Sequence, residues 1–126
     1  MCEWADLFIL LETGPEMLPG STRLKAGTAT KLALNQISTG AMARCGHIYE
    51  GYMVGVKSVN AKLHERTVRI ASGLLEISTD AAQAALDAAG GDIKVAVLMV
   101  RCDLSCDEAT DRLEKTKGHL RDALDL

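Results

Sequence analysis

Apolar residues recur along this chain at the three- and four-residue spacing that is typical of amphipathic helices. The spacing predicts a long helix over residues 21–45 and a second helix over residues 58–75. Ser21 or Thr22 is a suitable N-cap for the first of them, and Gly46 is a suitable C-cap. The pattern therefore predicts an all-α, mainly helical fold, in which alanine and leucine also favour helix.

The last third of the chain carries clear signals for short helices. Ser78 or Thr79 caps one helix, Asp92 caps the next, and Ser105 with Glu108 forms a capping box for a third. A final turn follows Gly118. The residues expected to face inward are Ala82, Ala85, Leu86 and Ala89, then Ile93, Ala96, Val97 and Val100, then Ala109 and Leu113, and last Leu120, Ala123 and Leu124.

Two segments have a different pattern. Residues 7–11 form a short apolar run between two acids, and turn residues follow it. This length favours one short, buried N-terminal strand, although Trp4, Leu7, Phe8 and Leu11 also fit the spacing of a helix. Residues 47–56 contain two glycines and two tyrosines, and they predict a loop with a short extended piece.

Composition narrows the classes of function. The chain has 126 residues, 48% hydrophobic and 25% charged, which is ordinary for a globular domain. Its net charge of −3 and the lack of a basic run argue against nucleic-acid binding. No apolar stretch is long enough to span a membrane, and acids stand near the start where a secretory signal would carry bases. We therefore expect a cytoplasmic protein that binds neither nucleic acid nor membrane.

The side chains that bind metals do not form a known ligand set. Cys2, Cys45, Cys102 and Cys106 are expected to be free thiols, and their spacing matches none of the usual zinc sites. The three histidines lie in three separate segments and are expected to be surface or capping residues. The sequence predicts neither a metal site nor a cofactor, and no catalytic residue is assigned.

The strongest candidate for a binding site is the start of the long helix. Residues 14–20 are rich in proline and glycine and lead into Ser21, Thr22, Arg23 and Lys25. Backbone N–H groups and the positive end of a helix dipole suit an anion, and the two cations add charge. The alternative is an ordinary capped helix that follows a loop.

The same stretch resembles a known family, the N-acetylmuramic acid 6-phosphate etherases, which contain a sugar-phosphate isomerase-type (SIS) domain and are related to the glucokinase regulatory proteins. The similar segments include Thr13-Gly-Pro-Glu16, Gly20-Ser-Thr-Arg-Leu-Lys-Ala-Gly-Thr-Ala29, Lys31-Leu-Ala-Leu-Asn35, Ser38-Thr-Gly-Ala-Met42, Asn60-Ala-Lys-Leu63, Glu65-Arg66, Ala84-Ala-Leu-Asp-Ala-Ala-Gly-Gly-Asp92 and Gly118-His-Leu-Arg121. The resemblance begins near Ala5 and concerns only the C-terminal part of the family. It implies that the SIS domain and its two catalytic glutamates lie outside this chain.

The resemblance also implies a division of the chain. Residues 1–20 would be a remnant of the SIS domain's edge, 21–76 the long helices that follow it, and 77–126 a three-helix module similar to ubiquitin-associated (UBA) domains. In the family, the lysine equivalent to Lys25 approaches the sugar phosphate, and Ser21, Thr22 and Arg23 would donate to the same anion. Glu16 is given no catalytic role, since a loop acceptor is its simpler use.

Three hypotheses of function follow. The chain is the C-terminal part of an etherase of cell-wall recycling, inactive alone, so whether it is an enzyme stays open. Alternatively, it is a non-enzymatic module that senses a sugar phosphate or binds a protein. In the third, it is a structural element that dimerises or covers a separate SIS-domain chain. The expected partners are a sugar phosphate, a second copy in a homodimer and such an SIS chain.

Overall fold

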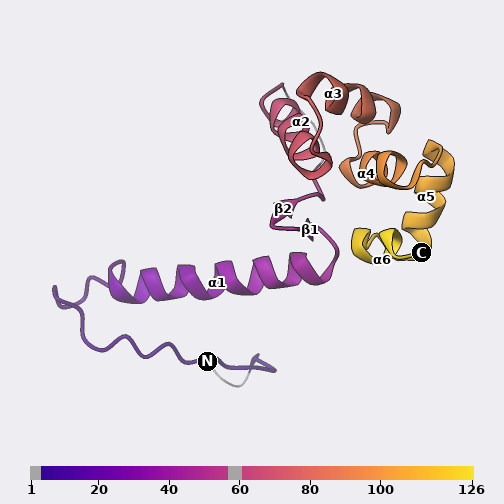
Figure 1. The fold of residues 1–126 in the computed structure, drawn as a ribbon. Helices are drawn as coiled ribbons and strands as arrows, with labels where there is room; N and C mark the ends of the chain where they lie inside the picture. The colour runs from indigo at the N-terminus through magenta and orange to yellow at the C-terminus, as the bar shows by residue number, and fades with distance from the viewer. Residues whose placement is uncertain (1–3, 57–60) are drawn as a thin grey trace. The chain divides into compact units, whose positions relative to one another are not determined.

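The computed structural model describes residues 4–56 and 61–126. Of residues 61 and 62 it describes the backbone but not the side chains. The fold is mainly helical, as predicted (Figure 1). Its elements in chain order are α1 (Lys25–Arg44), β1 (Ile48–Tyr49), β2 (Tyr52–Met53), α2 (Ala61–Leu75), α3 (Thr79–Ala88), α4 (Ile93–Cys102), α5 (Cys106–Lys115) and α6 (Leu120–Leu124).

The chain divides into two compact units between Gly40 and Ala41. In the first unit the predicted strand over residues 7–11 is absent, and the segment forms neither strand nor helix. Its side chains are exposed, from 40% at Leu11 to 77% at Leu7. The physical reason is that a strand needs a hydrogen-bonding neighbour, and the described part of the chain offers this segment none.

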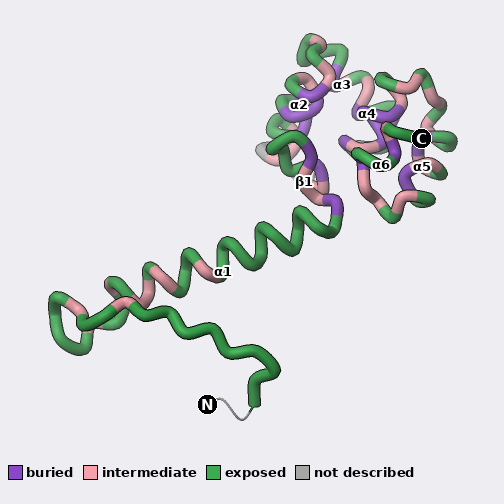
Figure 2. The backbone as a smooth tube through the Cα atoms, turned by 60° about the horizontal axis from the view of Figure 1, so that its bottom comes forward, coloured by how far each residue is buried: buried purple, intermediate pink, exposed green. Residues whose placement is uncertain are grey.

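Helix α1 is exposed along its length, and none of its residues is buried (Figure 2). It begins at Lys25 instead of residue 21, because residues 22–24 form a turn that precedes the first helical residue. It ends at Arg44, and Gly46 adopts a φ of 72°, the left-handed conformation expected after a helix. The predicted end is confirmed, whereas the predicted start is four residues early.

A small β-hairpin follows α1 in the second unit, where a loop with a short extended piece was predicted. β1 and β2 are antiparallel, and Glu50 and Gly51 form the two-residue turn between them with φ values of 47° and 79°. Two positive φ values are typical of the type I′ turn, whose twist suits a hairpin. The only strands in the described residues are thus these two and not one near the N-terminus.

Arg101 of α4 attaches this hairpin to the helices. Its guanidinium donates to the Tyr49 hydroxyl at 3.2 Å and to the carbonyl oxygen of Leu74 at 2.6 Å, and it lies 3.8 Å from the Glu50 carboxylate. The guanidinium of Arg121 lies over the Tyr49 ring, 5.5 Å from its centre. Burial raises the pKa of Tyr49, and the Glu50 carboxylate adds to this effect. Tyr49 is therefore fixed from two sides.

The hydrophobic core of the second unit is formed mainly by the helices from α2 to α6. The predicted caps are confirmed: Ser78 accepts from Ala81, Asp92 caps α4, and the Ser105–Glu108 capping box is complete. The prediction that Val100 faces inward is wrong, because Val100 is 47% exposed. Val95 and Leu98 are buried instead, since α4 contacts α2 and α3 as well as α5 and α6. The predicted helix start at residue 58 lies outside the described residues.

Candidate functional site

The start of α1 is stabilised by a side chain that comes from nine residues earlier. The Glu16 carboxylate accepts hydrogen bonds from the backbone N–H groups of Lys25 and Ala26, both at 3.0 Å. The bond from Ala26, followed by that from Lys25, lowers the pKa of Glu16 below its ordinary value. Glu16 therefore caps the helix as an ionised carboxylate, in agreement with its expected use as a loop acceptor.

The capping by Glu16 changes the predicted anion site. The N–H of Gly27 donates to the Thr22 carbonyl at 2.8 Å, and the N–H of Thr28 donates to the Leu24 carbonyl at 3.0 Å. The four N–H groups of residues 25–28 thus all have acceptors within the chain. These four N–H groups are therefore not open to an anion, contrary to the expectation for the start of this helix.

The structure places the four predicted residues in one compact turn but does not give them one surface. The backbone N–H of Ser21 donates to the Leu18 carbonyl, and the Ser21 carbonyl accepts from Leu24. Arg23 and Lys25 are exposed and line the same open depression of about 540 Å³. Ser21 and Thr22 are not part of its lining, which is completed by Leu24, Thr28, Ala29 and Leu32.

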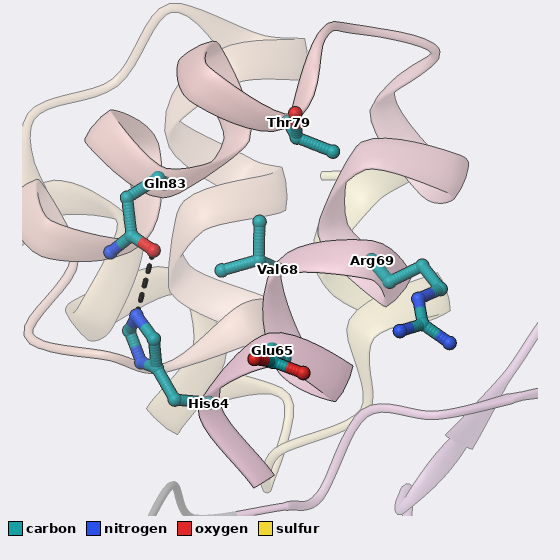
Figure 3. A pocket seen from close by; sticks show the side chains of 6 residues that line it. All are labelled: His64, Glu65, Val68, Arg69, Thr79 and Gln83. Atoms are coloured by element: carbon teal, nitrogen blue, oxygen red, sulfur yellow. Dashed lines mark hydrogen bonds between the residues drawn. The ribbon is translucent and has the colours of Figure 1, made fainter. Parts of the chain in front are cut away.

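A second cavity, which the sequence did not predict, lies between α2 and α3 (Figure 3). Its volume is about 300 Å³, and it is lined by His64, Glu65, Val68, Arg69, Thr79 and Gln83. The amide oxygen of Gln83 lies 2.7 Å from His64 Nε2, and the amide nitrogen of Gln83 donates to Asp87. Because Asp87 orients this amide, His64 Nε2 is the donor to Gln83. The histidine links two helices, a role that its place in the sequence did not reveal.

Neither cavity has the groups of a metal centre. No three His, Cys, Asp or Glu side chains gather as potential metal ligands within residues 4–56 and 63–126. Cys102 ends α4 and Cys106 begins α5, and both are half-buried free thiols packed against the core. In the same residues, no helix is long and apolar enough to cross a membrane.

Comparison with known proteins gives relatives over nearly the whole chain. The N-acetylmuramic acid 6-phosphate etherase of Klebsiella aerogenes is 51% identical over 124 residues, and that of Deinococcus radiodurans is 48% identical over 119. The etherase of Synechocystis is 47% identical over 121 residues. The chain is a relative of the N-acetylmuramic acid 6-phosphate etherases. The three matches cover 94–98% of this chain but 39–41% of the relatives, so the chain spans about two fifths of their length. No family model matches it.

The similarity to the etherases includes both candidate sites. The match to the Klebsiella etherase covers 98% of the chain, so the turn from Ser21 to Lys25 and the cavity at His64 both lie within it. The turn at the α1 start and its cap Glu16 therefore lie within the matched region.

Proposed function

We propose that this chain acts within an N-acetylmuramic acid 6-phosphate etherase, where it binds the phosphate of the sugar but does not supply the catalytic acid and base. The observation that carries the proposal is similarity to etherases over at least 94% of the chain, across the α1 start. Arg23 and Lys25 beside one open depression are suited to a phosphate ester. The same proposal includes a cytoplasmic location for the protein.

Two carboxylates of this chain, Glu16 and Glu108, do not fit the catalytic acid of an etherase. Cleavage of an ether by elimination needs a base for the proton and an acid for the leaving oxygen, and an acid that works near neutral pH needs a raised pKa. Among the described residues, the two carboxyls with a clear shift have lowered pKa values. Glu16 caps α1, and hydrogen bonds from the Ser105 hydroxyl and backbone N–H hold Glu108 ionised. Both are committed to helix caps.

The purified chain should show no turnover of N-acetylmuramic acid 6-phosphate. The expected result follows from the proposal that the catalytic acid and base lie outside this chain, and release of lactate above the buffer background is the measurement. A matched sample of a full-length relative, such as the Klebsiella etherase, controls for the substrate and the assay. Turnover that persists after repurification and is lost in a Glu16→Gln variant would show that the chain is catalytic by itself.

Lys25→Ala should weaken binding of the phosphosugar by about 1.5–3 kcal/mol, the value of a lost charge-assisted hydrogen bond. Binding is measured by NMR titration of backbone amides with N-acetylmuramic acid 6-phosphate. Lys31→Ala is the control, because Lys31 is also exposed on α1 but lies outside the depression. Equal loss in both variants, or shifts confined to α3–α5, would place the ligand elsewhere.

A non-enzymatic interaction module is the second candidate, and exposed apolar residues favour α1 as its surface. Leu32, Leu34, Ile37 and Met42 on α1 are each more than half exposed. Within α3–α6, by contrast, Val100 is the only exposed large hydrophobic residue. A contact through α1, with a second copy or with a separate SIS-domain chain, therefore has more apolar surface available than one through the UBA-like helices.

A further inference from the structure

The C-terminal end of α1 is attached to the helices of the second unit through Lys94. Its ammonium donates to the Gly118 carbonyl at 2.9 Å and to the Gly46 carbonyl at 3.5 Å, so one cation joins the segments that follow α5 and α1. A lysine in the first turn of α4 opposes the dipole of that helix, but here its charge meets the negative ends of two others. A Cβ atom at Gly46 would lie 2.8 Å from the Gly118 carbonyl oxygen, so this close approach requires glycine.

The boundary between the two compact units falls inside α1, between Gly40 and Ala41. Every residue from Leu34 to Arg44 is exposed, on both sides of that boundary (Figure 2). Helices in proteins usually gain most of their stability from packing, and this part of α1 buries no residue. Its local stability therefore depends on the helix propensity of its own residues.

Three successive residues at the boundary, Ser38, Thr39 and Gly40, are weak helix formers. No described atom lies within 4 Å of the position of a Cβ at Gly40, so no close contact explains a glycine inside the helix. The Ser38 hydroxyl donates to the Asn35 carbonyl at 3.2 Å, and bonds of this kind compete with the backbone bonds of a helix. Sharp bends in helices are typical of such pairs of glycine and serine.

We propose that residues 38–40 are a hinge within α1. The helical segment over residues 25–37, here called the arm, moves about this hinge relative to the second unit, while Lys94 holds the last turn of α1 in place. The inference stands without the proposed function, because it rests on the helix itself. It adds that whatever binds to the arm, a ligand at the α1 start or a partner along the exposed face, selects among its orientations.

Residual dipolar couplings of the backbone amides in an aligned medium test the hinge. The arm should not fit the alignment that describes the second unit, although its Cα chemical shifts remain helical. Gly40→Ala should bring the two alignments together, because alanine favours helix and the site has room for a methyl group. The same variant should slow hydrogen exchange of the amides of residues 41–44 by about fivefold, the factor that corresponds to the difference in helix propensity.

Thr30→Ala is the matched control for Gly40→Ala. It removes a weak helix former from the exposed surface of the arm, outside the hinge, and should leave the difference between the two alignments unchanged. A single alignment for the arm and the second unit in the unmodified chain would reject the hinge. Non-helical shifts over the arm would reject it as well, because the segment would then be unfolded instead of turning as a helix.

A second pair of variants tests the anchor. The amides of Gly46 and His47 donate to the carbonyls of Ala43 and Met42, which closes the end of α1. Lys94→Met should speed their exchange about tenfold, the factor of a lost charge-assisted hydrogen bond, and leave that of the amides within α5 unchanged. Lys117→Met removes an exposed lysine next to Gly118 and should change neither. Unchanged exchange at both amides in a folded Lys94→Met variant would show that Lys94 does not hold the end of α1.

Discussion

Leu98→Ala should lower the free energy of unfolding of the helical unit by about 2–5 kcal/mol, the usual range for a buried leucine. Leu98 is fully buried in α4, the helix that contacts α2, α3, α5 and α6. Removal of its side chain leaves a cavity among four helices, and the surrounding structure closes such a cavity only in part. The loss is a large share of the stability of a small domain.

Denaturant unfolding followed by circular dichroism measures this change. Val100→Ala is the matched control, because Val100 lies on the same helix but is 47% exposed. The periodicity of the sequence predicted the opposite ranking, with Val100 in the core, so the pair of variants tests the corrected core directly. A loss of stability at Val100 equal to that at Leu98 would contradict the packing described for α4.

The helices and caps of the second unit were predictable because their signals are local. Ser78, Asp92 and Ser105 each accept a hydrogen bond from an amide two or three residues ahead, so the sequence around each cap contains all the information. Ala82 in α3, Ala109 in α5 and Leu120 in α6 each lie on the one face of their helix that the apolar spacing predicts to be buried. All three are buried. The all-α fold class follows from these elements.

The features that the sequence did not predict depend on distant residues. α4 is covered on more than one side, so Val95 and Leu98 are buried although a pattern with one buried face leaves them outside. The hairpin turn contains Glu50 at a positive φ, where asparagine or glycine would have signalled it. At the candidate site, the sequence places Arg23 and Lys25 near the helix start, but the occupied backbone donors there depend on Glu16, nine residues from Lys25.

The exposed face of α1 leads to the second expected result, a homodimer at micromolar concentration that Ile37→Glu dissociates. Leu34, Ile37 and Ala41 follow one another at spacings of three and four residues and so form one apolar line on the helix. Leu34 and Ile37 are 61% and 56% exposed, so the segment before α1 does not fold back over them. The described residues of this chain thus leave the line in contact with water.

A second copy provides the same line, and a two-fold axis brings the two together. A helix of 20 residues is about 30 Å long, and a stable interface buries on the order of 800 Å² on each partner. The apolar surface for such an interface would come from two α1 helices together with the exposed segments over residues 7–11. Sedimentation velocity measures the oligomer, and Gln36→Glu is the control, because it adds the same charge about 100° around the helix from Ile37. A monomer that binds no apolar dye would contradict the dimer. A monomer that binds the dye would also contradict it and would indicate that the exposed face of α1 binds a different chain.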